Sequence, residues 1–177
     1  MSVTLAQFNT LNPAEATALL LTCCTSTSWA HQLTNTRPFE SVEALLTSSD
    51  QIWEHTQTHE SDLLEAFDGH PQIGNVASLK EKYRNTQDSA AHEQSGANDA
   101  ESQVLENLSQ GNQDYLDKFG FIFIVFATGK NAQQMLDLLL ARLPNNRATE
   151  LVNAAAEQNK ITRLRIRKLL GHEGTPE

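Results

Sequence analysis

The sequence predicts an all-α protein, a single-domain multi-helix bundle over residues 1–177 that carries one extended aromatic and β-branched segment near residues 119–126. Three observations support this prediction. Residues suited to capping a helix N-terminus precede most of the apolar runs, those runs repeat at helical spacing, and only one segment has the composition of a β-strand. The chain of 177 residues is long enough to bury a substantial core in one domain.

The first half of the chain is expected to form a series of short helices. Asn12 is a good N-cap, because Pro13 follows it at the first helical position, where its missing N–H has no intrahelical partner to lose. Further helices are expected to begin at Ser41, at Ser49 or Asp50, and at Ser61, each ahead of apolar residues. The helix that begins at Ser61 would run into Gly69.

The second half alternates between polar and helical patterns. Residues 85–100 are polar and predict a loop. The helix that follows is expected to end near Gly111. Asn131 can cap another helix, which ends before Pro144, and the longest helical pattern covers Ala148–Leu170.

One segment does not fit a helix. Residues 119–126 read FGFIFIVF, which by propensity predicts a buried strand. No second segment has this character, so the strand would lack a partner. The stretch is therefore either an extended piece of a helical protein or a helix start that overrides propensity.

Charge and cysteine content limit the function classes. The chain has 22 acidic residues against 13 basic ones and a net charge of −9, which argues against non-specific nucleic-acid binding. Two adjacent cysteines make a poor disulfide and indicate a reducing compartment. The N-terminus lacks a signal-peptide pattern, the end GTPE is no peroxisomal address, and no apolar run approaches a membrane span. We therefore expect a cytoplasmic protein without a membrane partner.

The stretch GHPQIG holds a histidine under unusual restraint. Pro71 fixes its own φ and disfavours the α region for His70, and flanking glycines permit backbone angles that other residues resist. His70 is thus expected at an element boundary with its ring aimed in one direction. The alternative is a simple turn without a role in chemistry.

Two other polar groups could join this histidine. Ser89 and Glu93 are four residues apart and would share a helix face, which Gln94 borders. Taken alone this is a solvated face, but with His70 it could supply a hydroxyl, a carboxylate and an amide to one polar site. In the basic run near the C-terminus, Arg165 borders the apolar side and could anchor a carboxylate, whereas the run could also simply complement the helix dipole.

Other motifs have plain alternatives. His55 and His59 would share one face of a helix and could bind a metal, as in a metal-dependent hydrolase, but a solvated polar face explains them as well. Cys23 and Cys24 are expected to act as small buried hydrophobes, and both tryptophans are expected in the core.

Several motifs in order carry a resemblance to a known family. They are FNTLNPAEATALLLTCCTSTSWAHQLTNTRPF (residues 8–39), HPQIG, SAAHEQSG, FGFIFIVFATGK, and RATEL followed by KITRLRI. Together they span almost the whole chain and resemble the 2-oxo-4-hydroxy-4-carboxy-5-ureidoimidazoline (OHCU) decarboxylases of urate degradation. Ile122 departs from the pattern, because the family usually has proline there.

The resemblance implies an all-α homodimer that needs no metal and no organic cofactor. It implies an anionic ureidoimidazoline as the small-molecule substrate, and (S)-allantoin and CO2 as products. By motif position it makes His70 and Glu93 the catalytic pair. The substrate-binding residues that it implies are Pro71, Ser89, Gln94, Phe121, Phe123, Ile124, Val125 and Arg165, with Arg163 as the alternative to Arg165.

A mechanism without a cofactor fits these residue types. The substrate has a C=N bond next to the carbon that loses CO2, so it can accept the electron pair itself, and His70 and Glu93 would assist as acid and base. The rival reading is a non-enzymatic helical interaction domain that uses FIFIVF as a hydrophobic docking segment.

Overall fold

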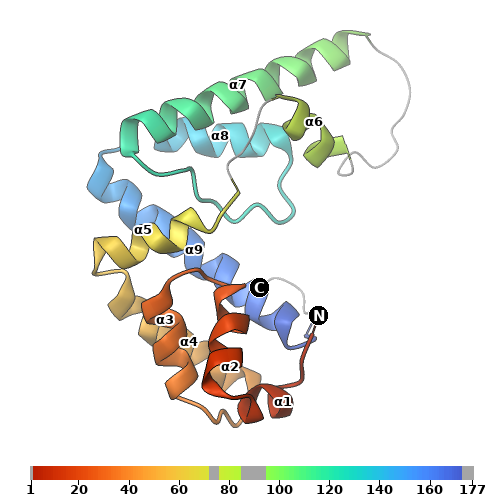
Figure 1. Ribbon diagram of the computed structural model, residues 1–177. Coiled ribbons are helices and arrows are strands. Elements are labelled where there is room, and N and C mark those ends of the chain that lie inside the picture. Colours follow the sequence, from red (N-terminus) through yellow and green to blue (C-terminus); the bar gives the residue numbers. More distant parts are fainter. Residues whose placement is uncertain (1, 72–75, 85–94, 173–177) are drawn as a thin grey trace. The chain divides into compact units, whose positions relative to one another are not determined.

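The computed structural model describes residues 2–71, 76–84 and 95–172, and all regular secondary structure within these ranges is helical (Figure 1). The helices are α1 (Leu5–Thr10), α2 (Pro13–Leu21), α3 (Thr27–Asn35), α4 (Val42–Thr56), α5 (Glu60–Asp68), α6 (Val76–Arg84), α7 (Ser95–Phe119), α8 (Ala132–Arg142) and α9 (Arg147–Leu169). The all-α prediction is confirmed. None of these helices combines the length and apolarity needed to cross a membrane.

The chain forms two compact units. The first contains Met1–His70 and Asn153–Glu177, and the second contains Pro71–Val152, so α9 supplies residues to both. The expectation of one family domain over the whole chain stays a prediction.

Three predicted helix starts are confirmed at the level of hydrogen bonds. In each case the side-chain oxygen of the N-cap accepts a bond from the backbone N–H three residues later. The distances are 2.9 Å for Asn12, 3.0 Å for Ser41 and 2.8 Å for Asn131. At Asn12 and Asn131 the side chain at the third helical position bonds back to the cap, which completes a capping box.

One predicted start in the first unit is wrong, and another differs from the structure by one residue. Helix α4 is continuous from Val42 to Thr56, and no helix begins at Ser49 or Asp50. Ser49 lies inside α4, fully buried, where its hydroxyl accepts a hydrogen bond from Trp29 Nε1 at 3.2 Å. Helix α5 begins at Glu60 with His59 as the N-cap residue, one residue before the predicted Ser61.

The longest helix is also not the predicted one. Helix α7 has 25 residues, begins at Ser95 inside the predicted loop and continues through Gly111 to Phe119, whereas α9 has 23. A glycine inside a helix costs about 1 kcal/mol, and here it gives room to α8, because an added Cβ would lie 2.6 Å from Leu139 Cδ2. Gly120, at φ +79°, then ends the helix by donating its N–H to Leu116 O at 2.8 Å.

The core of the first unit consists mainly of buried apolar side chains from its helices, including Phe8, Leu20, Trp29, Leu33, Leu46, Trp53, Phe67 and Ile166. Trp53 Nε1 donates to Ala155 O at 3.0 Å, which connects α4 to α9. Both tryptophans and both cysteines are buried, as predicted.

The Arg-Pro-Phe motif after α3 has a structural role. The Arg37 guanidinium donates hydrogen bonds to three backbone carbonyls, those of Thr34, Phe8 and Leu11, each at 2.9 Å. It also lies over the Phe8 ring, 5.5 Å from the centroid. One side chain therefore connects α1 to the end of α3.

The segment at 119–126 is extended after Phe119 and belongs to the core of the second unit. Phe121, Phe123 and Ile124 are buried, and the Tyr115 ring contacts the Phe121 and Phe123 rings at centroid distances of 5.8 and 5.3 Å. The prediction of an extended piece is confirmed, and the helix-start alternative is wrong. Because these side chains are buried, they do not form the hydrophobic docking segment of the interaction-domain reading.

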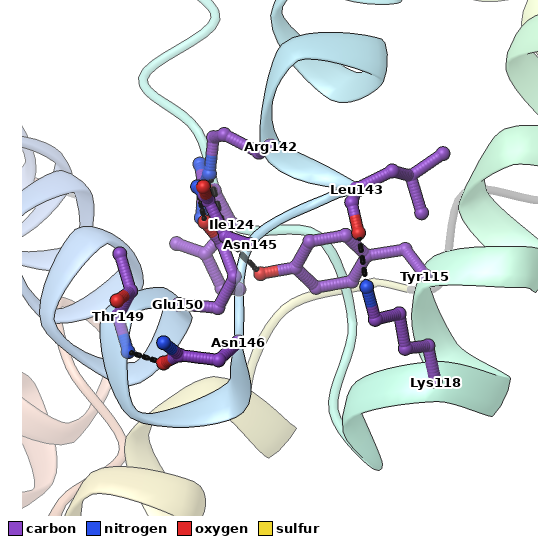
Figure 2. A network of polar contacts seen from close by, with 9 residues as sticks. All are labelled: Tyr115, Lys118, Ile124, Arg142, Leu143, Asn145, Asn146, Thr149 and Glu150. Carbon is purple, nitrogen blue, oxygen red and sulfur yellow. Dashed lines mark hydrogen bonds and ion pairs between the residues drawn. The ribbon is translucent and has the colours of Figure 1, made fainter.

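A buried polar network holds this segment against α8 and α9 (Figure 2). The Glu150 carboxylate is 0% exposed and accepts bonds from Tyr115 Oη at 2.5 Å, Arg142 Nε at 2.8 Å and Asn145 Nδ2 at 2.8 Å. Arg142 also donates to Ile124 O at 2.6 Å and lies over the Phe123 ring. The network satisfies a buried carboxylate and fixes a backbone carbonyl of a segment that pairs with no strand in the described part of the chain.

Candidate active site

His70 follows directly after helix α5, at the element boundary where the sequence predicts it. Its N–H donates to Phe67 O at 3.1 Å. Gly69 before it has φ −73°, an ordinary helical value, so the chain does not use the conformational freedom of this glycine. Gly69 instead provides space, because an added Cβ would lie 2.2 Å from Thr25 Oγ1. Gly74 lies outside the described residues.

The imidazole is the first member of a hydrogen-bonded chain that continues into α9. His70 Nε2 lies 2.5 Å from Gln158 Oε1, and Gln158 Nε2 donates to Thr162 Oγ1 at 3.1 Å. The Thr162 hydroxyl donates to Gln158 O at 2.9 Å. Gln158 and Thr162 are 0% and 2% exposed. The ring of His70 is thus aimed by a buried amide, as the restraint in its sequence suggests.

The surroundings of His70 favour its neutral form. Burial lowers the pKa of the imidazole from its ordinary value of 6.5, the hydrogen bond to Gln158 raises it, and the charge of Arg165 lowers it. A neutral imidazole near pH 7 has one nitrogen free to accept a proton.

The arginines of α9 have different partners. Arg163 forms an ion pair with Asp50, and Arg167 pairs with Glu43 at 3.1 Å. Arg165 donates to Cys23 O at 3.3 Å, and among the described residues no carboxylate pairs with it. Of the two alternatives left open by the sequence, Arg165 is therefore the guanidinium beside His70 that keeps its capacity for an anion.

The sequence alone did not identify Gln158 and Thr162 as site residues. The signal for them is spacing, because Gln158, Thr162 and Arg165 stand at i, i+4 and i+7 and so share one helix face. Their partner, His70, lies 88 residues from Gln158 in the chain. A periodic pattern within α9 cannot identify a partner at that separation.

The structure describes only some of the other predicted site residues. Pro71 is exposed. Ser89, Glu93 and Gln94 lie outside the described residues. Residues 121–125 belong to the second unit, and within the described part of the chain the backbone N–H groups of residues 122–125 have no hydrogen-bond acceptor. They keep the donors that the prediction assigns to them, although the carbonyl of Ile124 is taken by Arg142.

The histidine pair does not share a helix face. Helix α4 ends at Thr56, so His55 lies in its last turn and His59 stands outside it as the N-cap of α5. The two rings meet edge to face at a centroid distance of 5.1 Å. In the part of the chain that the structure describes, no three His, Cys, Asp or Glu side chains are grouped to hold a metal ion. The metal-hydrolase hypothesis assumed that His55 and His59 lie on one face of a single helix, and this assumption is wrong.

The two cysteines next to Arg165 are expected to be unreactive thiols. Burial raises the pKa of each to about 11, from 9.0. At pH 8 this lowers the thiolate fraction about 100-fold. We predict that a maleimide labels neither Cys23 nor Cys24 in the folded protein during a period that labels both in denaturant, as measured by mass spectrometry. Rapid labelling of the folded protein would contradict this.

Comparison with known proteins gives a consistent family. A family model described as OHCU decarboxylase matches residues 9–167. The uric acid degradation bifunctional protein TTL of Arabidopsis thaliana is 40% identical over 147 residues, which are 83% of this chain and 45% of that protein. The 2-oxo-4-hydroxy-4-carboxy-5-ureidoimidazoline decarboxylase of Halalkalicoccus jeotgali is 26% identical over 152 residues, 85% of this chain and 79% of that protein.

A solved structure is also similar. The crystal structure of OHCU decarboxylase in the presence of (S)-allantoin matches with a TM-score of 0.67 and 35% sequence identity, and the match covers 85% of this chain and 96% of that one. Three of the curated relatives are longer bifunctional proteins, of which this chain spans 45%, 32% and 33%. The family match includes His70, Gln158 and Arg165.

Proposed function

Because this chain belongs to the OHCU decarboxylase family, we propose that it converts 2-oxo-4-hydroxy-4-carboxy-5-ureidoimidazoline to (S)-allantoin and CO2. The observation that carries the proposal is the cluster of His70, Gln158 and Arg165. It combines a neutral, aimed imidazole with a guanidinium that has no carboxylate partner among the described residues. This is a suitable combination for binding an anion and moving a proton next to it.

The bond changes in this reaction can be assigned to the substrate. The bond between the ring carbon and the carboxylate breaks, and CO2 leaves. The electron pair moves into the neighbouring C=N bond, so that nitrogen takes a proton and an enol forms. The hydroxyl then loses its proton to become the ring carbonyl, and the neighbouring carbon is protonated on one face. The substrate thus supplies its own electron sink, and the proposal requires no organic cofactor and no metal.

The side chains have separate roles in this proposal. Arg165 holds the anionic or ureido end of the substrate with charge-assisted hydrogen bonds. His70, neutral near pH 7, accepts the proton of the hydroxyl, which assists the collapse to the carbonyl. By motif position, Glu93 is proposed as the catalytic carboxylate that flanks the hydroxyl-bearing carbon together with His70. Protonation of one ring face then sets the handedness of the product.

The direct test generates the unstable substrate in the cuvette. Urate oxidase and hydroxyisourate hydrolase would produce it from urate, and near-ultraviolet circular dichroism would follow the product. We expect the protein to accelerate formation of a chiral allantoin signal in proportion to its concentration. Slow formation of optically silent allantoin, at the rate seen without the protein, would contradict the proposed function.

A matched pair of variants tests which arginine binds the substrate. Arg165→Ala is expected to raise KM about 10- to 100-fold, because a hydrogen bond to a charged group contributes about 1.5–3 kcal/mol. Arg163→Ala, on the same helix, removes a partly exposed pair with Asp50 and is expected to leave KM within about twofold while it changes stability by less than about 1 kcal/mol. Steady-state kinetics in the coupled assay would check both. The reverse pattern would assign the substrate to Arg163.

Three further expectations belong to this proposal. We expect the homodimer that the resemblance implies, which sedimentation would measure. We also expect a cytoplasmic location, which fractionation of the source cells would test. The proposed contacts of the substrate with the backbone of residues 121–125 would appear as changed amide shifts in NMR spectra on addition of (S)-allantoin.

A further inference from the structure

The hydrogen bonds around Gln158 indicate which ring nitrogen of His70 carries a hydrogen. The Gln158 side chain is fully buried, and both ends of its amide have a partner, His70 on one side and Thr162 on the other. An amide has two different ends, since its oxygen only accepts and its nitrogen only donates. The orientation of the amide therefore decides which hydrogen the imidazole must carry.

Thr162 favours one orientation. Its hydroxyl has a single hydrogen, which is directed at the carbonyl of Gln158 at 2.9 Å, one turn earlier in α9. The hydroxyl oxygen is then left as an acceptor, and Gln158 Nε2 donates to it at 3.1 Å. This places Gln158 Oε1 against His70 Nε2. Two acceptors cannot share a hydrogen bond, so His70 Nε2 carries the hydrogen.

The other ring nitrogen is left available. Among the described residues nothing bonds to His70 Nδ1, and the charged group there that acts on the ring is Arg165. A second positive charge beside a guanidinium is unfavourable, which favours the neutral ring in the resting protein. Nδ1 is then an unprotonated nitrogen that can accept a proton.

We propose that Gln158, oriented by Thr162, is a positioning residue that holds His70 as its Nε2–H tautomer and so makes Nδ1 the atom that accepts a proton in the reaction. The inference rests on the proposed function for the role of Nδ1, whereas the tautomer itself does not depend on any activity. Gln158 does not touch the reacting atoms in this account. It acts through the imidazole.

Two substitutions of Gln158 separate positioning from packing. Gln158→Met keeps the length of the side chain but removes the acceptor, and it is expected to lower kcat about 10- to 100-fold, as the loss of an imidazole's supporting partner does, with a smaller change in KM. Gln158→Glu keeps an acceptor and adds charge. It is expected to raise the apparent pKa of the acidic limb in the pH profile of kcat/KM by about one unit or more, because an adjacent carboxylate stabilises the imidazolium.

Thr34→Val is the matched control for the loss of a buried polar contact. Thr34 is buried in the same unit and bonds to Thr17 at 2.9 Å, away from His70. This variant is expected to lose stability but to keep the wild-type kcat and pH profile. A change in the pH profile of Thr34→Val equal to that of the Gln158 variants would mean that the profile reports packing, and it would overturn the inference.

Nitrogen NMR of His70 provides a readout without activity. With ¹⁵N-labelled histidine, assigned by comparison with His70→Gln, the neutral ring in the wild type is expected to show a protonated Nε2 and an unprotonated Nδ1. Gln158→Met is expected to shift the ring toward a mixture of tautomers. A wild-type ring with its hydrogen on Nδ1 would overturn the inference, because the amide would then face the other way.

The failure of the inference and the failure of the proposed function are distinguishable. If wild-type protein forms chiral allantoin but folded Gln158→Met retains the wild-type kcat and pH profile, the positioning role is wrong while the function stands. If the wild type forms only racemic allantoin, the function and the role of Nδ1 as its base are both wrong. The ¹⁵N spectrum then still decides whether Gln158 selects the tautomer.

Discussion

Replacing His70 by alanine is expected to lower kcat for allantoin formation about 10²- to 10⁴-fold, the range that general acid–base assistance contributes. The substitution removes an imidazole that is aimed by a buried amide and lies beside Arg165, whose guanidinium has no carboxylate partner among the described residues. KM is expected to change less, since Arg165 remains to bind the anionic substrate. The coupled circular dichroism assay measures both constants.

His31→Ala is the control for this substitution. His31 lies in α3 of the same unit and is exposed, so its loss is expected to leave kcat unchanged. Folding of both variants would be checked by far-ultraviolet circular dichroism. If folded His70→Ala kept a rate within about threefold of the wild type, His70 would not be the base, and the acid–base account would be wrong.

Replacing Glu150 by alanine is expected to lower the free energy of unfolding by about 3–5 kcal/mol, the cost of breaking a buried ion pair by removing one partner. The carboxylate is 0% exposed, and its loss would leave the Arg142 guanidinium, which is 13% exposed, without its counter-ion. Tyr115 and Asn145 would lose an acceptor at the same time (Figure 2). Urea unfolding followed by tryptophan fluorescence and far-ultraviolet circular dichroism would measure the change.

An exposed ion pair in the same helix gives the comparison. Lys160 is 59% exposed and pairs with Glu157 at 2.5 Å, so Lys160→Ala is expected to change stability by less than about 1 kcal/mol. If the two substitutions changed the free energy of unfolding equally, burial would not explain the contribution of the Glu150 network to stability. The extended segment should be affected first, because Arg142 holds Ile124 O in the wild type.

The features that could be predicted from the sequence depend on nearby residues. The caps at Asn12, Ser41 and Asn131 each require a side chain and a backbone N–H three residues apart, and all three form. The restraint on His70 comes from the next residue. The strand-like composition of 119–126 also identified correctly a segment that is not helical.

The failures involve contacts between residues distant in the chain. Ser49 resembles a helix start, but its hydroxyl pairs with Trp29, 20 residues earlier, inside a continuous α4. Gly111 resembles a helix end, but its missing side chain gives room to Leu139 of α8. Gln158 was missed because its function depends on His70, 88 residues away. In each case the local pattern is the same with and without the distant partner.

The candidate site itself was only partly predictable. The apolar pattern of α9 placed Arg165 beside the buried side, but the family resemblance left Arg163 as an alternative substrate-binding residue. Their partners support the choice of Arg165, since Arg163 is paired with Asp50 and Arg165 is not paired with any described carboxylate. A helical period describes one face of one helix, and the charges on α4 that engage Arg163 and Arg167 lie outside that pattern.

The most direct test of the central claim is a crystal structure of this protein with (S)-allantoin bound. The account predicts that the Arg165 guanidinium contacts the ligand, that His70 faces it with Nδ1 while Nε2 stays on Gln158, and that Arg163 remains on Asp50. A ligand bound away from His70, or an Arg163 that leaves Asp50 to hold it while Arg165 does not, would contradict the account.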